Sequence, residues 1–321
     1  IPNALKIICT MTACKQPIST NLLRALSGQE VKYSENSILE RSYHFAWIAH
    51  HDQYRRDGSM YITHPIAVKE ILENEMQYTD ENILSAALLH DTLEDSSFSS
   101  HDLLSIVGSE DILQMVEGCT KVSKINSLCS SDMDMSVMLR AMEKDWRVVL
   151  IKVADRLHNL RTIDFLSDSK KMKIARQTYD VFVPLARRLG KRAAMNELGD
   201  RAFKIIDPVL FESLQRKVAS QTIQNIDTIS ETKKILSSIM EHEEINGVLK
   251  FRSKAIHSVH KKMIKYGFEH PSQVLDINAF RIIIQNEEFP VFYCYMVLAL
   301  IQQTFTTVPG TIKDYISNPK K

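Results

Sequence analysis

The chain has 321 residues, of which 44% are hydrophobic and 25% charged, with only nine glycines and nine prolines. This composition excludes a disordered or fibrous protein and favours helices arranged in two domains. Forty lysines and arginines balance 39 aspartates and glutamates, so no overall charge recruits DNA or an anionic membrane, and any site for a polyanion must be local.

Residues 1–14 are mildly apolar, but Lys6 interrupts them, and they fall short of the roughly 20 apolar residues that a membrane span needs. We therefore expect no membrane segment and a cytoplasmic protein. The five cysteines are scattered without the paired spacing of a zinc site, which indicates reduced thiols. Because the chain does not begin with methionine, we expect it to be part of a longer protein.

From residue 20 to about residue 217, apolar residues recur at intervals of three and four, and glycines are few. This periodicity predicts stacked amphipathic helices, so we expect an all-α first domain over residues 20–217. One buried helical face is expected within residues 81–95, where Thr79 or Asp80 is placed to cap the start. Similar apolar stripes run through residues 148–160 and 174–189.

Residues 218–240 are polar, contain no glycine or proline, and are typical of a connecting helix. Beyond them, β-branched runs at residues 245–251 and 279–284 flank a basic helical stretch, which indicates a second, α+β domain over residues 241–321. The expected fold class is therefore mostly α, with an all-α domain followed by a smaller α+β domain.

The strongest chemical signal is the sequence HDTLED at residues 90–95, which follows an apolar helix and contains His90, Asp91, Glu94 and Asp95. Residues three and four apart share a helix face, so these acids would lie close together, which is unfavourable unless a cation lies among them. Alternatively, His90 is an ordinary buried histidine and the acids form a solvated helix end, although acids at a C-terminal end oppose the helix dipole.

An adjacent His-Asp pair cannot close a metal shell alone, so further ligands must come from elsewhere. His50 stands at the end of a helical run, and Asp155 interrupts an apolar stripe where a carboxylate requires a partner. Two imidazoles and two carboxylates suit Mn²⁺, Fe²⁺, Co²⁺ or Zn²⁺ with open positions for water. These residues predict a metal-dependent phosphohydrolase.

Further motifs accompany this cluster: QYRRDG at residues 53–58, YITHP at 61–65, KVADRLHNLRT at 152–162 and PLARRLG at 184–190. Together with the His-Asp pair they resemble the hydrolase domain of the RelA/SpoT homologue family. The resemblance extends over residues 38–321. It implies an HD-type helical domain that cleaves the 3′-diphosphate from the guanosine alarmone (p)ppGpp, yielding GDP or GTP and pyrophosphate, usually with one Mn²⁺ ion.

The resemblance also implies roles for individual residues. It makes His50, His90, Asp91 and Asp155 the metal ligands, and Glu94 and Asp95 the acids that activate water. The implied substrate contacts are Arg41, Asn159 and Thr162; Ser42 stands where the family has a second basic residue, so guanine binding is expected to differ in detail. His64 precedes a proline at a helix start and could instead be structural.

Residues 250–265 carry several lysines and arginines and no acid. They could form a solvated helix face, but they also resemble the family's nucleotidyltransferase-like synthetase domain, which transfers pyrophosphate from ATP to GDP or GTP. The resemblance assigns Arg252 and Lys254 to ATP, Asp276 to Mg²⁺, and Lys313 and Lys320 to phosphates.

This second match is eroded, because Phe251, Ala255, His257 and His260 replace residues typical of the family. The chain also ends before the segment that supplies the family's guanine-stacking tyrosine and catalytic glutamate. We therefore expect this domain to be incomplete and inactive, with Mg²⁺ needed only if a longer form synthesises.

The first hypothesis is thus a hydrolase whose second domain is a scaffold or regulator. The alternatives are a phosphohydrolase for another nucleotide, a bifunctional synthetase and hydrolase in full-length form, and a non-catalytic alarmone sensor. Glu94 and Asp95 speak against the sensor, which would not need a water-activating pair. Contacts with the ribosome or a regulator are expected only through regions absent from this chain.

Overall fold

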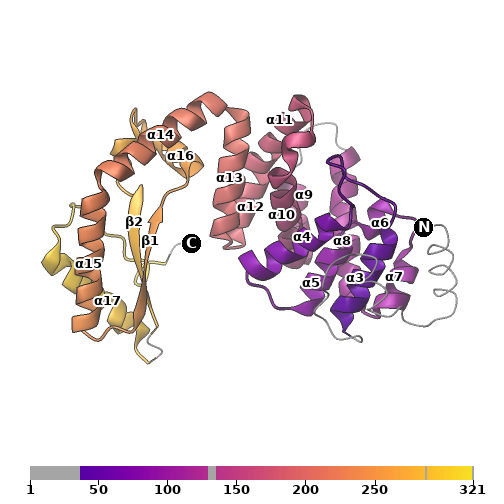
Figure 1. Ribbon diagram of the computed structural model, residues 1–321. Helices are drawn as coiled ribbons and strands as arrows, with labels where there is room; N and C mark the ends of the chain where they lie inside the picture. The colour runs from indigo at the N-terminus through magenta and orange to yellow at the C-terminus, as the bar shows by residue number, and fades with distance from the viewer. Residues whose placement is uncertain (1–36, 129–134, 286–287, 320–321) are drawn as a thin grey trace. The chain divides into compact units, whose positions relative to one another are not determined.

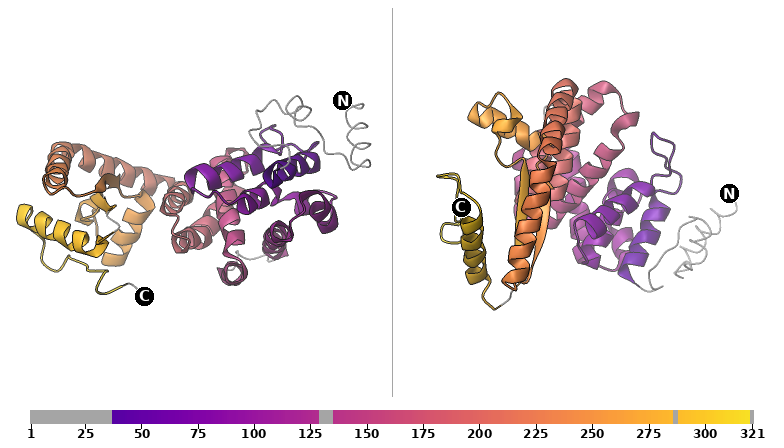
Figure 2. Two further views of the ribbon diagram at one scale, coloured as in Figure 1. Left: turned by 90° about the horizontal axis from the view of Figure 1, so that it is seen from below. Right: turned by 60° about the vertical axis from the view of Figure 1, so that its left-hand side comes forward.

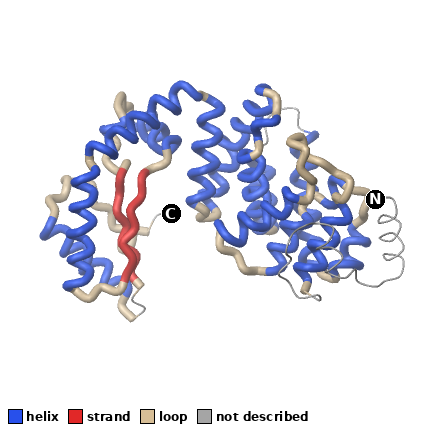
Figure 3. The backbone as a smooth tube through the Cα atoms, in the orientation of Figure 1, coloured by secondary structure: helices blue, strands red, loops and turns tan. Residues whose placement is uncertain are grey.

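The computed structural model describes residues 37–128, 135–285 and 288–319. They divide into two compact units, the first ending at Ile206 and the second starting at Asp207 (Figure 1). The described part of the first unit is helical throughout, and the second adds one pair of strands (Figure 3). This confirms the mostly α fold class. Within the described ranges, none of the helices combines the length and apolar character needed to cross a bilayer.

The helical segments of the first unit pack against one another (Figure 2). In chain order they are α3 (Ile38–Ala49), α4 (Thr63–Glu70), the π-helical turn η1 (Ile71–Glu75), α5 (Glu81–Leu89), α6 (Thr92–Asp95), α7 (Ser100–Val107), α8 (Glu110–Leu128), α9 (Met135–Lys144), α10 (Trp146–Arg161), the 3₁₀ turn η2 (Ile163–Phe165), α11 (Asp168–Gln177), the π-helical turn η3 (Thr178–Phe182), α12 (Val183–Arg188) and α13 (Arg192–Ile206).

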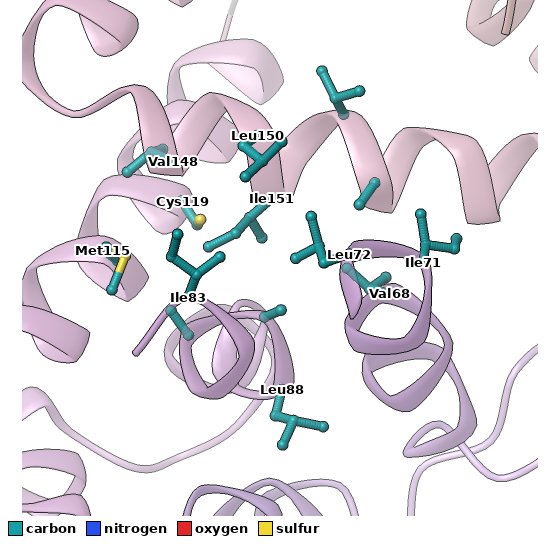
Figure 4. Packing of buried hydrophobic residues seen from close by; sticks show 14 of the residues in the cluster. Val68, Ile71, Leu72, Ile83, Leu88, Met115, Cys119, Val148, Leu150 and Ile151 are labelled. Carbon is teal, nitrogen blue, oxygen red and sulfur yellow. The ribbon is translucent and has the colours of Figure 1, made fainter. Parts of the chain in front are cut away.

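Helix α5 is the centre of this unit. Asp80 caps its start by accepting hydrogen bonds from the backbone N–H groups of Asn82 and Ile83, as the sequence predicted. Residues 83–89 of α5 are all buried, because α3, α4, α8 and α10 pack around them. Figure 4 shows apolar side chains of α4, α5, α8 and α10 packed in one buried cluster, in which Ile83 lies beside Ile151. A helix that is apolar on every side requires such a surrounding layer.

A close approach between α8 and α10 depends on Gly118. A Cβ atom added to Gly118 would lie 2.6 Å from Cγ2 of Val148, which is well inside van der Waals contact. The missing side chain therefore allows the two helices to pack closely at this point.

We predict that Gly118→Ala lowers the free energy of unfolding by about 1 kcal/mol. Overpacking of about 1–3 kcal/mol should exceed the roughly 1 kcal/mol that alanine gains in helix propensity. Urea denaturation of the variant measures this difference. In a Val148→Ala background, where the obstructing methyl groups are absent, the same change should be neutral or stabilising; equal stabilisation in both backgrounds would contradict the close approach.

The second unit has a small core. Its elements are α14 (Pro208–Gln224), α15 (Ile226–His242), β1 (Gly247–Ser253), α16 (Ile256–Tyr266), the 3₁₀ turn η4 (Pro271–Gln273), β2 (Asn278–Ile284) and α17 (Pro290–Thr304). The strands pair antiparallel, with Gly247 opposite Ile284 and Ser253 opposite Asn278. Met240, Ile245 and Val297 are the buried centre of the apolar cluster beside the strands.

One expectation needs adjustment. The single connecting helix expected over residues 218–240 is interrupted at Asn225, so that its first part belongs to α14 and its remainder to α15. Of the five cysteines, Cys119 and Cys294 are free thiols, and the other three lie outside the described residues.

Candidate metal centre and substrate pocket

The His-Asp pair lies where α5 ends. The sequence predicted one helix over residues 81–95, but α5 stops at Leu89 and the short helix α6 starts at Thr92. His90 is fully buried at this break, and its Nδ1 atom lies 2.8 Å from the carbonyl oxygen of Ala87. Because a carbonyl only accepts hydrogen bonds, Nδ1 must carry the proton. The Nε2 atom therefore presents a lone pair, and it has no hydrogen-bond partner.

His50 is held in the same way. It follows the last residue of α3, and its Nδ1 lies 2.8 Å from Oε1 of Gln53. The amide nitrogen of Gln53 donates to the backbone oxygen of Asp95, so the amide oxygen faces His50 and must accept from Nδ1. The Nε2 atom of His50 is buried without a partner, and the ring stacks on Tyr61 at 4.6 Å between centroids.

Two carboxylates lie beside the ring of His90. Nε2 of His90 is 3.1 Å from Oδ2 of Asp91 and 4.0 Å from Oδ1 of Asp155. With the proton of His90 on Nδ1, these contacts bring acceptor atoms face to face in a buried place. Such an arrangement is stabilised by a cation that both atoms can bind.

The structure adds His64 to this cluster. Its Nε2 atom is 3.3 Å from Oδ1 of Asp155 and 3.6 Å from Oδ2 of Asp91. The ligand atoms of His64, His90 and Asp91 all lie within 4.8 Å of one another, a spacing that could hold a metal ion. The tightest group of ligand atoms therefore contains His64 and not His50. From the sequence, His50 was the predicted ligand and His64 was left as structural.

A buried ammonium group compensates these charges. Nζ of Lys152 lies 3.8 Å from Asp91 and 3.7 Å from Asp155, too far for a hydrogen bond but close enough for strong attraction. Burial alone would lower the pKa of Lys152, but the carboxylates of Asp155 and Asp91 outweigh it and raise that pKa. The lone pairs of both carboxylates stay available to a second cation.

The pKa values of the two carboxylates shift downward, opposite to that of Lys152. Burial would raise the pKa of Asp91, yet its positively charged surroundings, which include the Lys152 ammonium, hold it well below its usual range. For Asp155, burial is likewise outweighed by Lys152 and His64, which lower its pKa. Since both pKa values are below those of the unfolded chain, their contribution to stability is present above about pH 4 and is lost as the pH falls further.

Glu94 and Asp95 project from α6 beside the cluster. Partial burial raises the pKa of Glu94, which favours a role in proton transfer near neutral pH. The hydroxyl of Tyr61 lies 2.8 Å from Oδ2 of Asp95 and 2.9 Å from Oδ2 of Asp91. Tyr61 thus links the predicted water-activating acids to the predicted metal ligands.

A cavity of about 460 Å³ opens onto these groups. The predicted site residues that line it are Asp91, Glu94, Asp95, Asp155, Asn159 and Thr162. Arg41 is not among the described residues that line it, since its Nε and Nη2 atoms donate to the carbonyl of Val107 at 3.3 and 3.0 Å. The structure therefore does not bring Arg41 to the other predicted substrate contacts.

The sequence contained a signal for Lys152. Lys152, Asp155, Asn159 and Thr162 are spaced by three, four and three residues, so they share one face of α10 and its C-terminal end. A polar face on an otherwise buried helix indicates a functional lining. Tyr61 and His64 belong to the motif at residues 61–65, but their place in the site could not be read from it, because only the fold brings the start of α4 to α10.

In the second unit, Asp276 is held by two lysines. Nζ of Lys254 lies 2.8 Å and Nζ of Lys262 lies 2.7 Å from its carboxylate oxygens. Burial would raise the pKa of Asp276, but these two lysines lower it to about 2. Arg252 on β1 and Lys313 are exposed, and Lys320 lies outside the described residues. Of the residues assigned to the synthetase remnant, the structure joins Lys254 and Asp276.

Lys152→Met tests the charge balance of the first unit. In EDTA the variant should lose about 3 kcal/mol of unfolding free energy, because two buried carboxylates lose their ammonium partner. Added Mn²⁺ should stabilise it more than the unmodified protein, because the cation no longer faces a neighbouring positive charge. Denaturation with and without Mn²⁺ measures both effects.

Lys121→Met is the matched control, since this lysine is 74% exposed and pairs with Glu117 on the surface of α8. Its loss should change stability by less than about 1 kcal/mol. If Lys152→Met were as stable in EDTA as this control, the charge compensation described here would be wrong.

Comparisons with known proteins agree with both units. A family model described as HD domain matches residues 42–191, and one described as a region found in RelA / SpoT proteins matches residues 251–321. GTP pyrophosphokinase rsh of Brucella melitensis is 35% identical over 288 residues, which cover 89% of this chain and 37% of that protein.

A probable guanosine-3′,5′-bis(diphosphate) 3′-pyrophosphohydrolase of Synechocystis is 35% identical over 303 residues, covering 91% of this chain and 38% of that protein. The chain thus spans a little over a third of the length of these relatives. One solved structure, described as a metazoan ortholog of SpoT that hydrolyzes ppGpp, is 24% identical. It covers 57% of this chain and 98% of that one with a TM-score of 0.37, a likeness too low to support an argument about function.

Proposed function

The chain belongs to the RelA/SpoT homologue family, and on that premise we propose that its first unit hydrolyses (p)ppGpp to GDP or GTP and pyrophosphate. The observation that carries this proposal is the pair of buried histidines, His50 and His90, whose Nε2 atoms have no partner. Asp91 and Asp155, which lie beside His90, line a cavity of about 460 Å³ together with His64, and this cavity can admit part of a nucleotide. The name of the Synechocystis relative describes the same reaction.

We propose that His50, His90, Asp91 and Asp155 hold the metal ion and that the ion is Mn²⁺. Imidazole nitrogens and carboxylate oxygens are a donor set that divalent first-row cations accept. When bound, such a cation supplies Lewis acidity and makes a coordinated water more acidic. Nε2 of His64 faces the same carboxylates and is a candidate for an additional ligand.

The acids of α6 would manage protons. In the proposed reaction, water adds to phosphorus, the bond between phosphorus and the 3′ oxygen breaks, and the 3′ oxygen takes up a proton. Glu94 has a raised pKa and lines the cavity, so its carboxylate can accept a proton from water and return it as an acid. Asp95, held by Tyr61, orients the water in this proposal.

Asn159 and Thr162 are proposed as substrate contacts because both line the cavity on the α10 side. The role of Arg41 stays a prediction, since its guanidinium is bound to Val107. The domain boundaries at residues 217 and 241, and the cytoplasmic location, also stay predictions.

The hydrolysis is tested by incubating ppGpp with Mn²⁺ and separating the products by chromatography. The unmodified protein should release GDP and pyrophosphate, and EDTA should stop the reaction. Asp91→Ala removes a ligand, and Glu94→Gln removes the proton acceptor, so each should lower kcat at least a hundredfold.

Asp168→Asn, a fully exposed acid on α11, is the control and should react at the normal rate. Full activity in both site variants would contradict the assignment. If ppGpp bound to the Mn²⁺-loaded protein but persisted, the protein would be an alarmone sensor.

For the second unit we propose a scaffolding or regulatory role without synthesis. Asp276, the residue assigned to Mg²⁺, is already paired with Lys254 and Lys262. Neutralising both lysines would be needed before this carboxylate could bind a cation strongly.

Incubation of the chain with ATP, GDP and Mg²⁺ should therefore yield no ppGpp, as measured by the same chromatography. Formation of ppGpp would support the bifunctional alternative. A longer form of the protein that synthesised ppGpp, while this chain did not, would restrict the proposal to this part of the molecule.

A further inference from the structure

The second unit contains a cavity of about 440 Å³, between the junction of α14 and α15 and the segment that leads into β2. None of the described residues that line it is charged, although this unit contains many lysines, arginines and acids. Arg252 and Lys254, which the resemblance assigns to ATP, do not line it, and neither does Asp276. The cavity therefore lies outside the residues of the synthetase remnant, and it suits an uncharged ligand.

One part of the lining is a stripe of uncharged polar side chains on the two helices. Their positions are four, three and four residues apart, so they share one side of α14 and α15; they are Gln221, Asn225, Thr228 and Thr232. Four residues farther along α15, Leu236 is buried, as expected of a position that faces a core. The inward side of these helices therefore changes from apolar to polar where the cavity opens.

Gln221 has a buried atom that requires a partner. Its Oε1 atom is buried and accepts no hydrogen bond. A carbonyl oxygen in this state is unfavourable, and a chain retains one mainly where another group binds. Asn225, Thr228 and Thr232 add further donors and acceptors to the same stripe. The stripe therefore fits a ligand with several hydrogen-bonding groups.

The rest of the lining is largely apolar and comes from other elements. Val274 and Ile277 are almost fully buried, and the partly buried ring of Phe280 lies on β2. That ring is tilted against Phe251 of β1, with 5.3 Å between the ring centroids. A flat ligand can therefore place one face on apolar and aromatic groups while its edge meets the polar stripe.

Asn278 joins the two sides of the cavity. It lies at the start of β2, and its side chain exchanges hydrogen bonds of 3.2 and 3.3 Å with the hydroxyl of Thr222 on α14. The strand and the helix are thereby held together next to the cavity. A ligand that enters a site already formed has less to order on binding.

We propose that this cavity binds the base of an adenine nucleoside. The carboxamides of Gln221 and Asn225 each offer a donor and an acceptor, the pair that complements the N7 atom and the N6 amino group of adenine. Guanine presents two acceptors on that edge and is read by arginine or lysine, which the described lining lacks. A phosphate would also find no cation there, so a nucleoside fits better than a nucleotide.

Calorimetric titration of the whole chain with adenosine tests the site, and it does not depend on hydrolysis by the first unit. Adenosine should bind, and guanosine should bind about tenfold more weakly. Gln221→Met keeps the length of the side chain but removes its amide, so it should weaken adenosine binding about fivefold. Undetectable binding of adenosine, or equal affinity for the two nucleosides, would overturn the proposal.

Gln224→Met is the matched control, because Gln224 is an exposed glutamine of the same helix that does not line the cavity. It should bind adenosine like the unmodified protein, and so should Arg252→Met. An equal loss of affinity in Gln221→Met and Gln224→Met would contradict the assignment. Weaker binding in Arg252→Met would place the nucleoside at the synthetase remnant and would overturn it as well.

Urea denaturation gives a second readout for Gln221→Met. Because the change removes a buried oxygen that has no partner, the free variant should be at least as stable as the unmodified protein. Added adenosine should raise the urea midpoint of the unmodified protein more than that of the variant. A variant that is much less stable would show that Gln221 already has its partner within the fold, and the proposal would fail.

Discussion

The hydrogen bond from Nδ1 of His90 to the carbonyl of Ala87 is the constraint on which the site depends. It fixes the ring proton on the side away from the acids, so that a lone pair faces Asp91 in a fully buried place. Buried polar atoms without partners are unfavourable, and a chain retains them only where something else binds. The same device at His50 makes a satisfied core histidine a poor explanation for either residue.

The packing of the helices in the first unit fixes the position of His90 and of the acids beside it. Helix α5 is enclosed by four other helices, so its C-terminal end, and with it the carbonyl of Ala87, has little freedom. The break after Leu89 then turns α6 so that Glu94 and Asp95 line the cavity beside the cluster. Helix α10 supplies the opposing side, with Lys152 and Asp155 one turn apart. A rigid core and a charged cavity therefore depend on the same helices.

Much of this could be predicted from the sequence. Helical periodicity gave the all-α first unit, the cap at Asp80 and the position of α10, because these are local properties of the chain. The clustering of Asp155 with the His-Asp pair was predictable too, since a carboxylate in a buried stripe requires a partner. The interruption at Asn225 was not, because no glycine or proline marks it.

The remaining features depend on contacts between distant segments. His64 lies beside His158, which follows it by about a hundred residues, and no local pattern encodes that meeting. Arg41 shows the converse, since a position matched by motif alone is bound instead to the carbonyl of Val107 in α7. Lys152 lies between these cases, because its spacing from Asp155 was visible while its role as a counter-charge was not.

In the proposed metal centre, the Nε2 atoms of buried histidines and two carboxylates bind one divalent cation. Anomalous X-ray diffraction from crystals grown with Mn²⁺ tests it most directly. We expect a single strong peak in the first unit, about 2.0–2.3 Å from Nε2 of His50 and His90 and from oxygens of Asp91 and Asp155. The same map shows whether His64 is a further ligand. A peak at another place, or an ion bound through Nδ1 of either histidine, would contradict it.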